Sequence, residues 1–224
     1  MTALAVIFWA SVGLLVYTHV GYPALAGVLS RLRRPSAPPA APPLTPAAPP
    51  LTPAARPSVS VIVAAYAEQD VIARRVENLR GLRYPSELVE VIVACDGSPD
   101  ATPARARDAG ADLVLELPRE GKIRAQDAAV ARASGELVAF SDANVLWDPD
   151  ALSALVAPFA DPRVGYVCGD VRFVNERGTN QEGVYWRYEM ALRGFESRLR
   201  SVTGGNGAIY ATRRDAYIVV DPIM

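Results

Sequence analysis

The sequence predicts an α/β domain with a doubly wound, mostly parallel sheet, preceded by one transmembrane helix and a Pro-rich linker. Three regions of different composition support this prediction: an apolar segment at 3–29, a Pro/Ala tract at 35–57 and a mixed region at 58–224. In the mixed region, short β-branched runs alternate with stretches typical of helices. Such alternation indicates strands joined by right-handed helical crossovers, and therefore a sheet covered on both faces.

The segment 3–29 contains no Asp, Glu, Lys or Arg, and its length is sufficient to cross the ~30 Å hydrocarbon core of a bilayer. A cleaved signal peptide would begin with a basic residue and have a shorter apolar run, so the pattern favours an anchor. His19 lies near a kink expected at Pro23, and we interpret it as part of an interfacial polar fringe. The first basic residues after the segment are Arg31, Arg33 and Arg34. The positive-inside rule therefore predicts a single-pass protein of the inner or plasma membrane, with its domain in the cytoplasm.

The tract 35–57 consists almost entirely of Pro and Ala, with a few Leu and Thr residues. The unit Ala-Pro-Pro-Leu-Thr-Pro-Ala occurs at 41–47 and again at 48–54. Such a composition cannot build a core and favours extended polyproline II structure. We interpret the tract as a spacer between the bilayer and the domain; a ligand for a proline-binding domain is the alternative.

The composition excludes some classes of function. A net charge of -1 gives no basic excess, so we expect no nucleic-acid partner. One histidine and two cysteines leave few ligands for zinc. Cys95 and Cys168 each end a strand-like run, and we interpret both as reduced, buried thiols of a cytosolic domain.

The mixed region predicts strands at 59–64, 89–94, 112–116 and 136–141. Helices are predicted between them at 68–82, 100–109 and 122–134, and a further, strongly apolar helix at about 181–200. Ligands of doubly wound sheets bind at the carboxyl ends of the strands. Six polar or aromatic residues follow the strands at this edge: Tyr66, Glu68, Asp96, Lys122, Asp142 and Asn144.

These side chains suit a nucleotide. An aromatic ring such as that of Tyr66 can stack on a base, and the ammonium of Lys122 can offset phosphate charge. Asp142 and Asn144 lie two residues apart in an extended segment, so they point the same way and offer oxygen ligands for Mg²⁺ or Mn²⁺. Each residue also has a structural alternative, such as a turn at Asp96 or a helix cap at Asp142. Their order on consecutive strand ends favours the functional interpretation.

Four runs together resemble family-2 glycosyltransferases with the Rossmann-like GT-A fold: 61–68, 94–98, 121–122 and 141–144. The glycine-rich stretch 203–211 strengthens this resemblance. The resemblance implies that Tyr66, Glu68 and Asp96 surround the nucleoside of a nucleotide-sugar, such as a UDP-sugar, with Lys122 near the diphosphate. Asp142 and Asn144 would form the family's Asp-x-Asp metal motif, with an amide in place of one carboxylate. The acceptor side of the sugar pocket would be lined by Gly204, Gly205, Asn206 and Gly207.

The resemblance implies metal-assisted, inverting sugar transfer to a cell-envelope polysaccharide or glycolipid. Family members have an acidic catalytic base after the glycine-rich turn, whereas here the only carboxylate after Asp215 is Asp221. We therefore expect that the sequence is truncated before the catalytic base and that this chain shows no turnover. Two alternatives stay open: an inactive, membrane-tethered nucleotide-binding module, and a nucleotidyltransferase. The sequence identifies neither the sugar, the acceptor nor any protein partner.

Overall fold

The computed structural model describes residues 2–32, 56–171, 183–199, 205 and 207–219. The chain divides into two compact units. One unit contains the amino-terminal helix and helix α7 (Val184–Leu199), and the other contains the sheet. Helix α7, which lies within the predicted domain 58–224, thus belongs with the amino-terminal helix. Most of the Pro/Ala tract lies outside the described residues.

A continuous helix from Thr2 to Leu32 is long and apolar enough to cross a membrane. It consists of α1 (Thr2–Val16), a π-helical turn (Tyr17–Gly21) and α2 (Tyr22–Leu32). Pro23 provides a reason for the turn, because proline has no N–H for the carbonyl of His19, four residues earlier, and its ring displaces that carbonyl. The irregularity expected at Pro23 therefore takes the form of a π-helical turn just before it.

The sheet has six strands in the order β3-β2-β1-β4-β6-β5. Their bounds are β1 (Val59–Ala65), β2 (Val89–Asp96), β3 (Leu113–Leu117), β4 (Leu137–Asp142), β5 (Tyr166–Cys168) and β6 (Tyr210–Arg213). Strands β1 to β4 pair in parallel, with Val59 opposite both Val89 and Leu137. Strand β6 runs antiparallel to β4 and β5. The mostly parallel sheet and its first four strands are confirmed, whereas β6 was not predicted.

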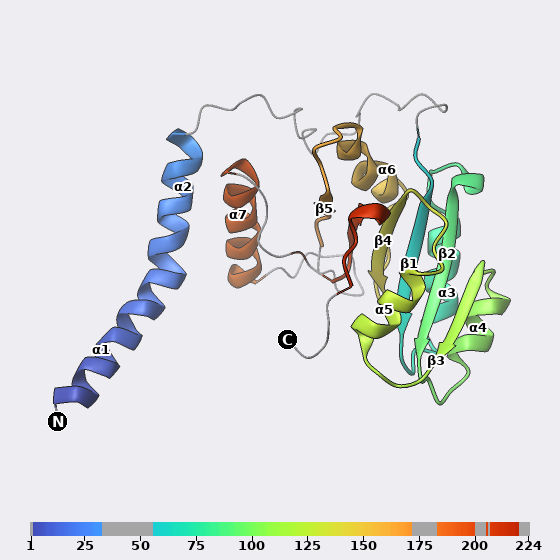
Figure 1. Cartoon of the computed structure of the whole chain (residues 1–224), viewed down its shortest axis with the longest axis horizontal. Coiled ribbons are helices and arrows are strands. Elements are labelled where there is room, and N and C mark those ends of the chain that lie inside the picture. The colour runs from blue at the N-terminus through green and yellow to red at the C-terminus, as the bar shows by residue number, and fades with distance from the viewer. Residues whose placement is uncertain (1, 33–55, 172–182, 200–204, 206, 220–224) are drawn as a thin grey trace. The chain divides into compact units, whose positions relative to one another are not determined.

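Helices cover both faces of the sheet, as predicted (Figure 1). They are α3 (Ile72–Arg80), α4 (Thr102–Asp108), α5 (Lys122–Val130) and α6 (Ala151–Val156), with short 3-10 turns at Ser86–Leu88, Ala157–Ala160 and Arg214–Ala216. Helices α3, α4 and α6 pack on the face that carries Val61 and Val63, while α5 packs on the face that carries Ile62. The alternation of side chains along β1 thus supplies two cores.

Two predictions about local structure need correction. The helix predicted at 68–82 begins at Ile72, because the segment before it forms a loop tied to the residues that follow β2. Neither cysteine forms a disulfide, but only Cys95 is buried, whereas Cys168 is half-buried. Burial raises the pKa of the Cys95 thiol to about 11, which keeps it protonated and unreactive at neutral pH.

Candidate functional site

The first part of the site joins the ends of β1, β2 and β3. Tyr66 follows β1 and is 44% exposed, and the guanidinium carbon of Arg119 lies 3.4 Å from the centroid of its ring. Arg119 Nη1 also donates to Asp96 Oδ2 at 2.5 Å. The prediction did not include Arg119 among the site residues. Its place after the third strand, in the same run as Lys122, was the signal that could have identified it.

Asp96 ends β2, and its carboxylate is almost completely buried. It accepts the backbone N–H of Glu120 at 2.8 Å and that of Gly121 at 3.0 Å and 3.1 Å, besides the bond from Arg119. Burial raises the pKa of Asp96, but the two N–H groups and Arg119 outweigh it and hold that pKa below its usual range. The carboxylate is therefore ionised at neutral pH, and its charge fixes the loop that begins α5.

Gly97 allows this loop to approach β2. Its φ is +65°, in the left-handed region that favours glycine. A Cβ at this position would lie 2.8 Å from Arg119 Cβ and 2.9 Å from Arg119 N. Only glycine therefore fits beneath the loop in its present position.

The second part of the site is centred on Lys122, the first residue of α5. Its Nζ forms an ion pair with Oδ1 of Asp142, which ends β4. A Cβ on Gly207 would lie 3.2 Å from Lys122 Nζ and 3.9 Å from Asp142 Oδ2, so the backbone of Gly207 lies against this pair. Both charged side chains remain open to solvent, at 45% and 34% exposure.

Other predicted residues lie in less connected positions. Glu68 is half-buried, and its backbone N–H donates to Thr102 Oγ1 at 2.9 Å. Asn144 is exposed. Gly205 is exposed and belongs to the unit of the amino-terminal helix. The residues Gly204, Asn206 and Asp221 lie outside the described part of the chain.

The turn between Tyr66 and Glu68 contains an unusual backbone conformation. Ala67 has a φ of +54°, in the left-handed region, although it carries a side chain. This conformation costs about 1–2 kcal/mol in a non-glycine residue. The N–H of Ala67 donates to Ser98 Oγ at 3.3 Å, so the turn is tied to the segment that follows β2. Backbone strain of this kind often lies at functional sites.

Trp147 links the segments around the site through hydrogen bonds. Its N–H donates to Asn78 Oδ1 at 2.9 Å, and its carbonyl accepts from Asn78 Nδ2 at 3.0 Å. Its indole N–H donates to the carbonyl of Ala208 at 3.3 Å, and the buried Arg75 lies 4.8 Å from its ring centroid. Burial lowers the pKa of Arg75 to about 9, and the charge of Asp142 opposes this shift. Trp147 thus connects α3 and the segment after β4 to the residue after Gly207.

The oxygen atoms at the end of β4 suit a hard cation only in part. Among the described residues, no group of three or more His, Cys, Asp or Glu side chains could hold a metal ion. Asp142 and Asn144 offer one carboxylate and one amide oxygen, and Mg²⁺ is commonly held by one or two carboxylates together with substrate phosphates and water. The donor set therefore fits a cation that binds together with a diphosphate.

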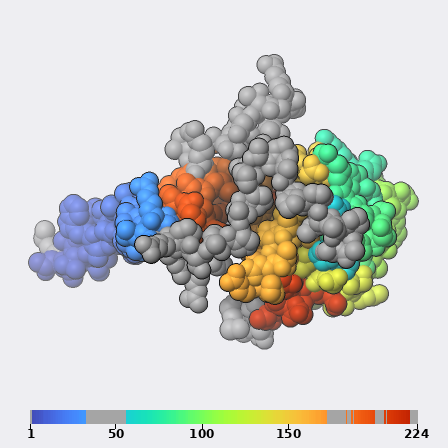
Figure 2. All heavy atoms as spheres, turned by 90° about the horizontal axis from the view of Figure 1, so that it is seen from above, coloured from blue at the N-terminus to red at the C-terminus, as the bar shows by residue number. Residues whose placement is uncertain are grey.

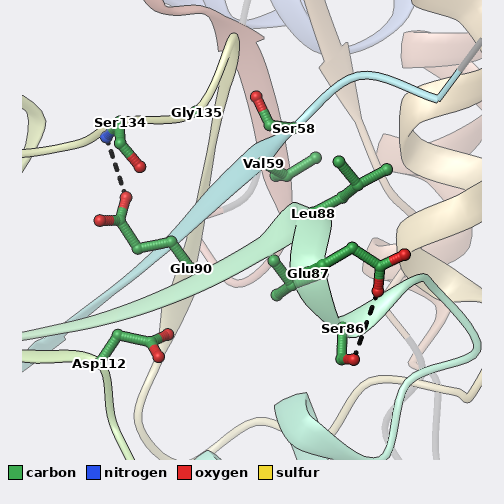
Figure 3. A pocket seen from close by; sticks show the side chains of 10 residues that line it. Ser58, Val59, Ser86, Glu87, Leu88, Glu90, Asp112, Ser134 and Gly135 are labelled. Atoms are coloured by element: carbon green, nitrogen blue, oxygen red, sulfur yellow. Dashed lines mark hydrogen bonds between the residues drawn. The ribbon is translucent and has the colours of Figure 1, made fainter.

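A separate hollow of about 390 Å³ lies at the opposite edge of the sheet, where β1 and β2 begin (Figure 3). It is lined by residues such as Ser58, Leu88 and Glu90. The backbone N–H of Ser134 donates to Glu90 Oε2 at 2.9 Å, so that carboxylate holds a loop. Since ligands of such sheets bind at the carboxyl ends, the hollow is separate from the candidate site.

Comparisons with known proteins agree with this geometry. Residues 60–219 match the model of the family described as Glycosyl transferase family 2. A beta-monoglucosyldiacylglycerol synthase from Synechocystis sp. is 32% identical over 200 residues, which cover 83% of this chain and 40% of the synthase. An N-acetylglucosaminyltransferase from Rhizobium leguminosarum bv. trifolii is 35% identical over 129 residues, which cover 54% of this chain and 70% of that protein. The chain thus spans less than half the length of the synthase.

Two solved structures share the architecture. The mannosyltransferase PcManGT from Pyrobaculum calidifontis, in complex with GDP-Man and Mn²⁺, has a TM-score of 0.68 and 30% identity, covering 90% of this chain and 55% of that chain. Glucosyl-3-phosphoglycerate synthase from Mycobacterium tuberculosis, with Mn²⁺ and UDP-Glc, has a TM-score of 0.51 and 28% identity. The match covers 76% of this chain and 64% of that chain. Because the family model matches most of the sequence and the sheet agrees with these GT-A structures, this chain belongs to glycosyl transferase family 2.

Proposed function

We propose that this chain forms the nucleotide-sugar site for transfer of a sugar to a hydroxyl of a cell-envelope polysaccharide or glycolipid, with a divalent cation and inversion at the anomeric carbon. The observation that carries the proposal is the set of strand-end contacts at Tyr66, Asp96, Lys122, Asp142 and Gly207. These residues come from separate segments, and they combine a stacking surface with phosphate-binding and cation-binding groups. Family membership favours glycosyl transfer over nucleotidyl transfer.

The nucleoside would bind at the end of β1 and β2. Tyr66 would stack on the base, and Arg119 would either move from the ring face or form the second side of the stack. The Asp96 carboxylate is already occupied by the 119–121 loop, so direct contact with the nucleoside requires release of one of these bonds. In this proposal Asp96 acts first by fixing the loop and then as a nucleoside ligand.

The diphosphate would lie beside Lys122, where the ammonium and the first N–H groups of α5 both favour negative charge. The bound diphosphate would compete with Asp142 for Lys122 and so leave the Asp142 carboxylate available to a cation. Asp142 and Asn144 would hold that cation, which supplies positive charge for the departing diphosphate. The backbone at Gly207 would leave room for the sugar, because it carries no side chain.

Donor identity and location are part of the proposal. We propose a UDP-sugar as the donor, and the GDP-Man complex of the Pyrobaculum enzyme makes a guanosine nucleotide the natural competitor in a test.

We also propose that the helix Thr2–Leu32 anchors the chain in the cell membrane, with the sheet unit in the cytoplasm, because basic residues follow it. A reporter fused to the carboxyl terminus that is active only outside the cytoplasm would contradict this orientation.

Calorimetry on the full chain in detergent tests donor binding. UDP should bind more tightly with Mn²⁺ than in EDTA, and Asp142→Ala should abolish this metal dependence. Asp148→Ala is a matched control, because Asp148 is an exposed carboxylate six residues further along the same segment. Equal UDP affinity with Mn²⁺ and in EDTA for the unsubstituted chain would refute the role of the cation.

Turnover needs a separate test. Among the described residues we assign no catalytic base, so the expectation of no turnover stays a prediction. The assay supplies radiolabelled nucleotide-sugars together with a membrane extract as the acceptor source. Transfer by the purified chain that is lost in Asp221→Asn would contradict the prediction and assign Asp221 as the base, whereas nucleotide binding without transfer would support a binding module.

A further inference from the structure

We propose that α7 lies in the interfacial layer of the bilayer, docked along the carboxyl-terminal half of the anchor helix, so that the protein meets the membrane through two helices. The inference rests on the proposed anchor and is independent of the transfer reaction. In both views α7 lies beside α2 (Figure 1 and Figure 2), within one compact unit. Three contacts explain why α7 docks at this place.

The first contact occurs at the carbonyl that Pro23 leaves without its helical partner. In a regular α-helix the carbonyl of His19 would accept the N–H of residue 23, which proline lacks. The hydroxyl of Tyr188, on α7, donates to this carbonyl at 2.9 Å. A backbone carbonyl without a partner costs several kcal/mol in lipid, so a donor at this point of a membrane helix is a specific stabilising contact.

The second contact is a buried hydrogen bond between Tyr22 and Glu196. The hydroxyl of Tyr22 donates to Glu196 Oε1 at 2.8 Å, and Glu196 is only 6% exposed. A carboxylate in such a place needs hydrogen-bond donors, because an unpaired buried charge is strongly destabilising. The two residues are 174 positions apart in sequence, so the bond ties the far end of the chain to the anchor.

The third contact is close packing at small residues of α2. A Cβ on Gly27 would lie 3.4 Å from the ring of Phe195, and Ala26 beside it is buried. Small residues allow helices in membranes to approach closely and to pack by van der Waals contact. The contact at Tyr188 lies near His19 and that at Phe195 lies near Gly27, so α7 runs alongside the anchor in the same direction.

The position of these contacts along the anchor gives their depth. His19 and Gly27 precede Arg31, the first charge, by about 18 Å and 6 Å at 1.5 Å per residue. The anchor of 31 residues is roughly 46 Å long, which exceeds the ~30 Å hydrocarbon core. We place that core from the start of the apolar run at Ala3, so that it ends near residue 22 and the last turns of the anchor project into the headgroup layer. The contacts with α7 therefore straddle the boundary between acyl chains and headgroups.

The composition of α7 fits that boundary. Its 16 residues are too few to span the core, and it carries both acidic and basic side chains. Arg193 lies over the ring of Trp186 at 5.6 Å, and Arg198 lies over the ring of Phe195 at 5.1 Å. Aromatic rings combined with arginine are typical of helices at the membrane–water interface.

Quenching of tryptophan fluorescence tests the inference on the full chain in lipid vesicles. The sequence has three tryptophans, so pairs of Trp→Phe substitutions leave Trp9, Trp147 or Trp186 alone. Lipids brominated near the headgroup end of the acyl chain should quench Trp186, and lipids brominated near the bilayer centre should quench Trp9. Trp147, buried in the sheet unit, should keep its emission with both lipids and is the negative control.

The outcomes separate the two proposals. Quenching of Trp9 without quenching of Trp186 would refute the interfacial position of α7 and leave the anchor intact. An unquenched Trp9 would refute the anchor itself, and with it the inference. UDP binding, measured on the unsubstituted chain, tests the proposed function separately from either result.

Thiol cross-linking tests the docking contact directly. In a background of Cys95→Ser and Cys168→Ser, the pair Gly27→Cys and Phe195→Cys should be joined by a short bifunctional thiol reagent in native membranes. The control pair places cysteine at Gly13 instead of Gly27, since no atom lies within 4 Å of a Cβ at Gly13. Equal cross-linking of both pairs, or of neither, would overturn the docking of α7 on α2.

Discussion

Alanine at Gly97 should destabilise the sheet unit more than alanine at Gly110, although both glycines have positive φ angles of +65° and +91°. Alanine in the left-handed region costs about 1–2 kcal/mol, and this applies at both positions. At Gly110 nothing lies within 4 Å of an added Cβ. At Gly97 the Cβ would lie 2.8 Å from Arg119 Cβ and 2.9 Å from Arg119 N, well inside the ~3.5–4.0 Å of normal contact.

The steric cost of the added Cβ at Gly97 depends on whether Arg119 can move away. Its backbone cannot move away without stretching the bonds that Glu120 and Gly121 donate to Asp96. Overpacking of this kind typically costs about 1–3 kcal/mol, which is the expected difference between the two variants. For a domain of this size, each kcal/mol lowers the melting temperature by roughly 2–4 °C, so Gly97→Ala should melt about 2–12 °C below Gly110→Ala.

The assay is thermal unfolding of the full chain in detergent, followed by the emission of Trp147 as the sole tryptophan. Trp147 is buried in the sheet unit and reports on its unfolding. UDP affinity should also fall in Gly97→Ala and stay unchanged in Gly110→Ala, because only Gly97 lies beneath the 119–121 loop. Equal melting temperatures and equal UDP affinities for the two variants would refute the reasoning.

Three further predictions concern the same unit. Because the pKa of Asp96 is lowered in the folded state, its stabilising effect should be present above its unfolded pKa of ~3.9 and should be lost as pH falls through the folded value. The melting temperatures of the unsubstituted chain and Asp96→Asn should therefore converge below about pH 4; a constant gap would contradict this. Ala67→Gly should raise the melting temperature, since it removes a strain of about 1–2 kcal/mol; no gain in thermal unfolding would show that the loop already relaxes this strain. Trp147→Phe removes the bond to Ala208 and should cost about 0.5–1.5 kcal/mol in chemical denaturation and weaken UDP binding near Gly207; unchanged affinity would mean that Trp147 does not position that segment.

Features that depend on local pattern could be predicted from the amino-acid sequence. The charge-free run before Arg31 predicted a helix able to cross a membrane, and the structure has one from Thr2 to Leu32. The β-branched runs predicted β1 to β4 and their parallel arrangement, because periodicity and length are properties of each segment. The order of Tyr66, Asp96, Lys122 and Asp142 at successive strand ends followed from the topology of such sheets.

The contacts between distant segments became visible in the three-dimensional fold. Strand β6 has just four residues, and its place beside β4 depends on antiparallel pairing with Leu137–Phe140. That pairing places Gly207, which precedes β6, against the Lys122–Asp142 ion pair. No local pattern predicts this contact. A hydrophobic or polar pattern tells which face of a segment is buried but does not identify its partner.

The same reason separates the predicted from the observed roles of individual side chains. The sequence marked Asp96 as a nucleoside ligand, but only the fold revealed that its carboxylate holds the loop that carries Arg119. The sequence marked the helix at about 181–200 as apolar, but only the fold paired Tyr188 and Glu196 with the anchor. Local composition fixes what each segment can do, and long-range packing decides which group satisfies each buried donor and acceptor.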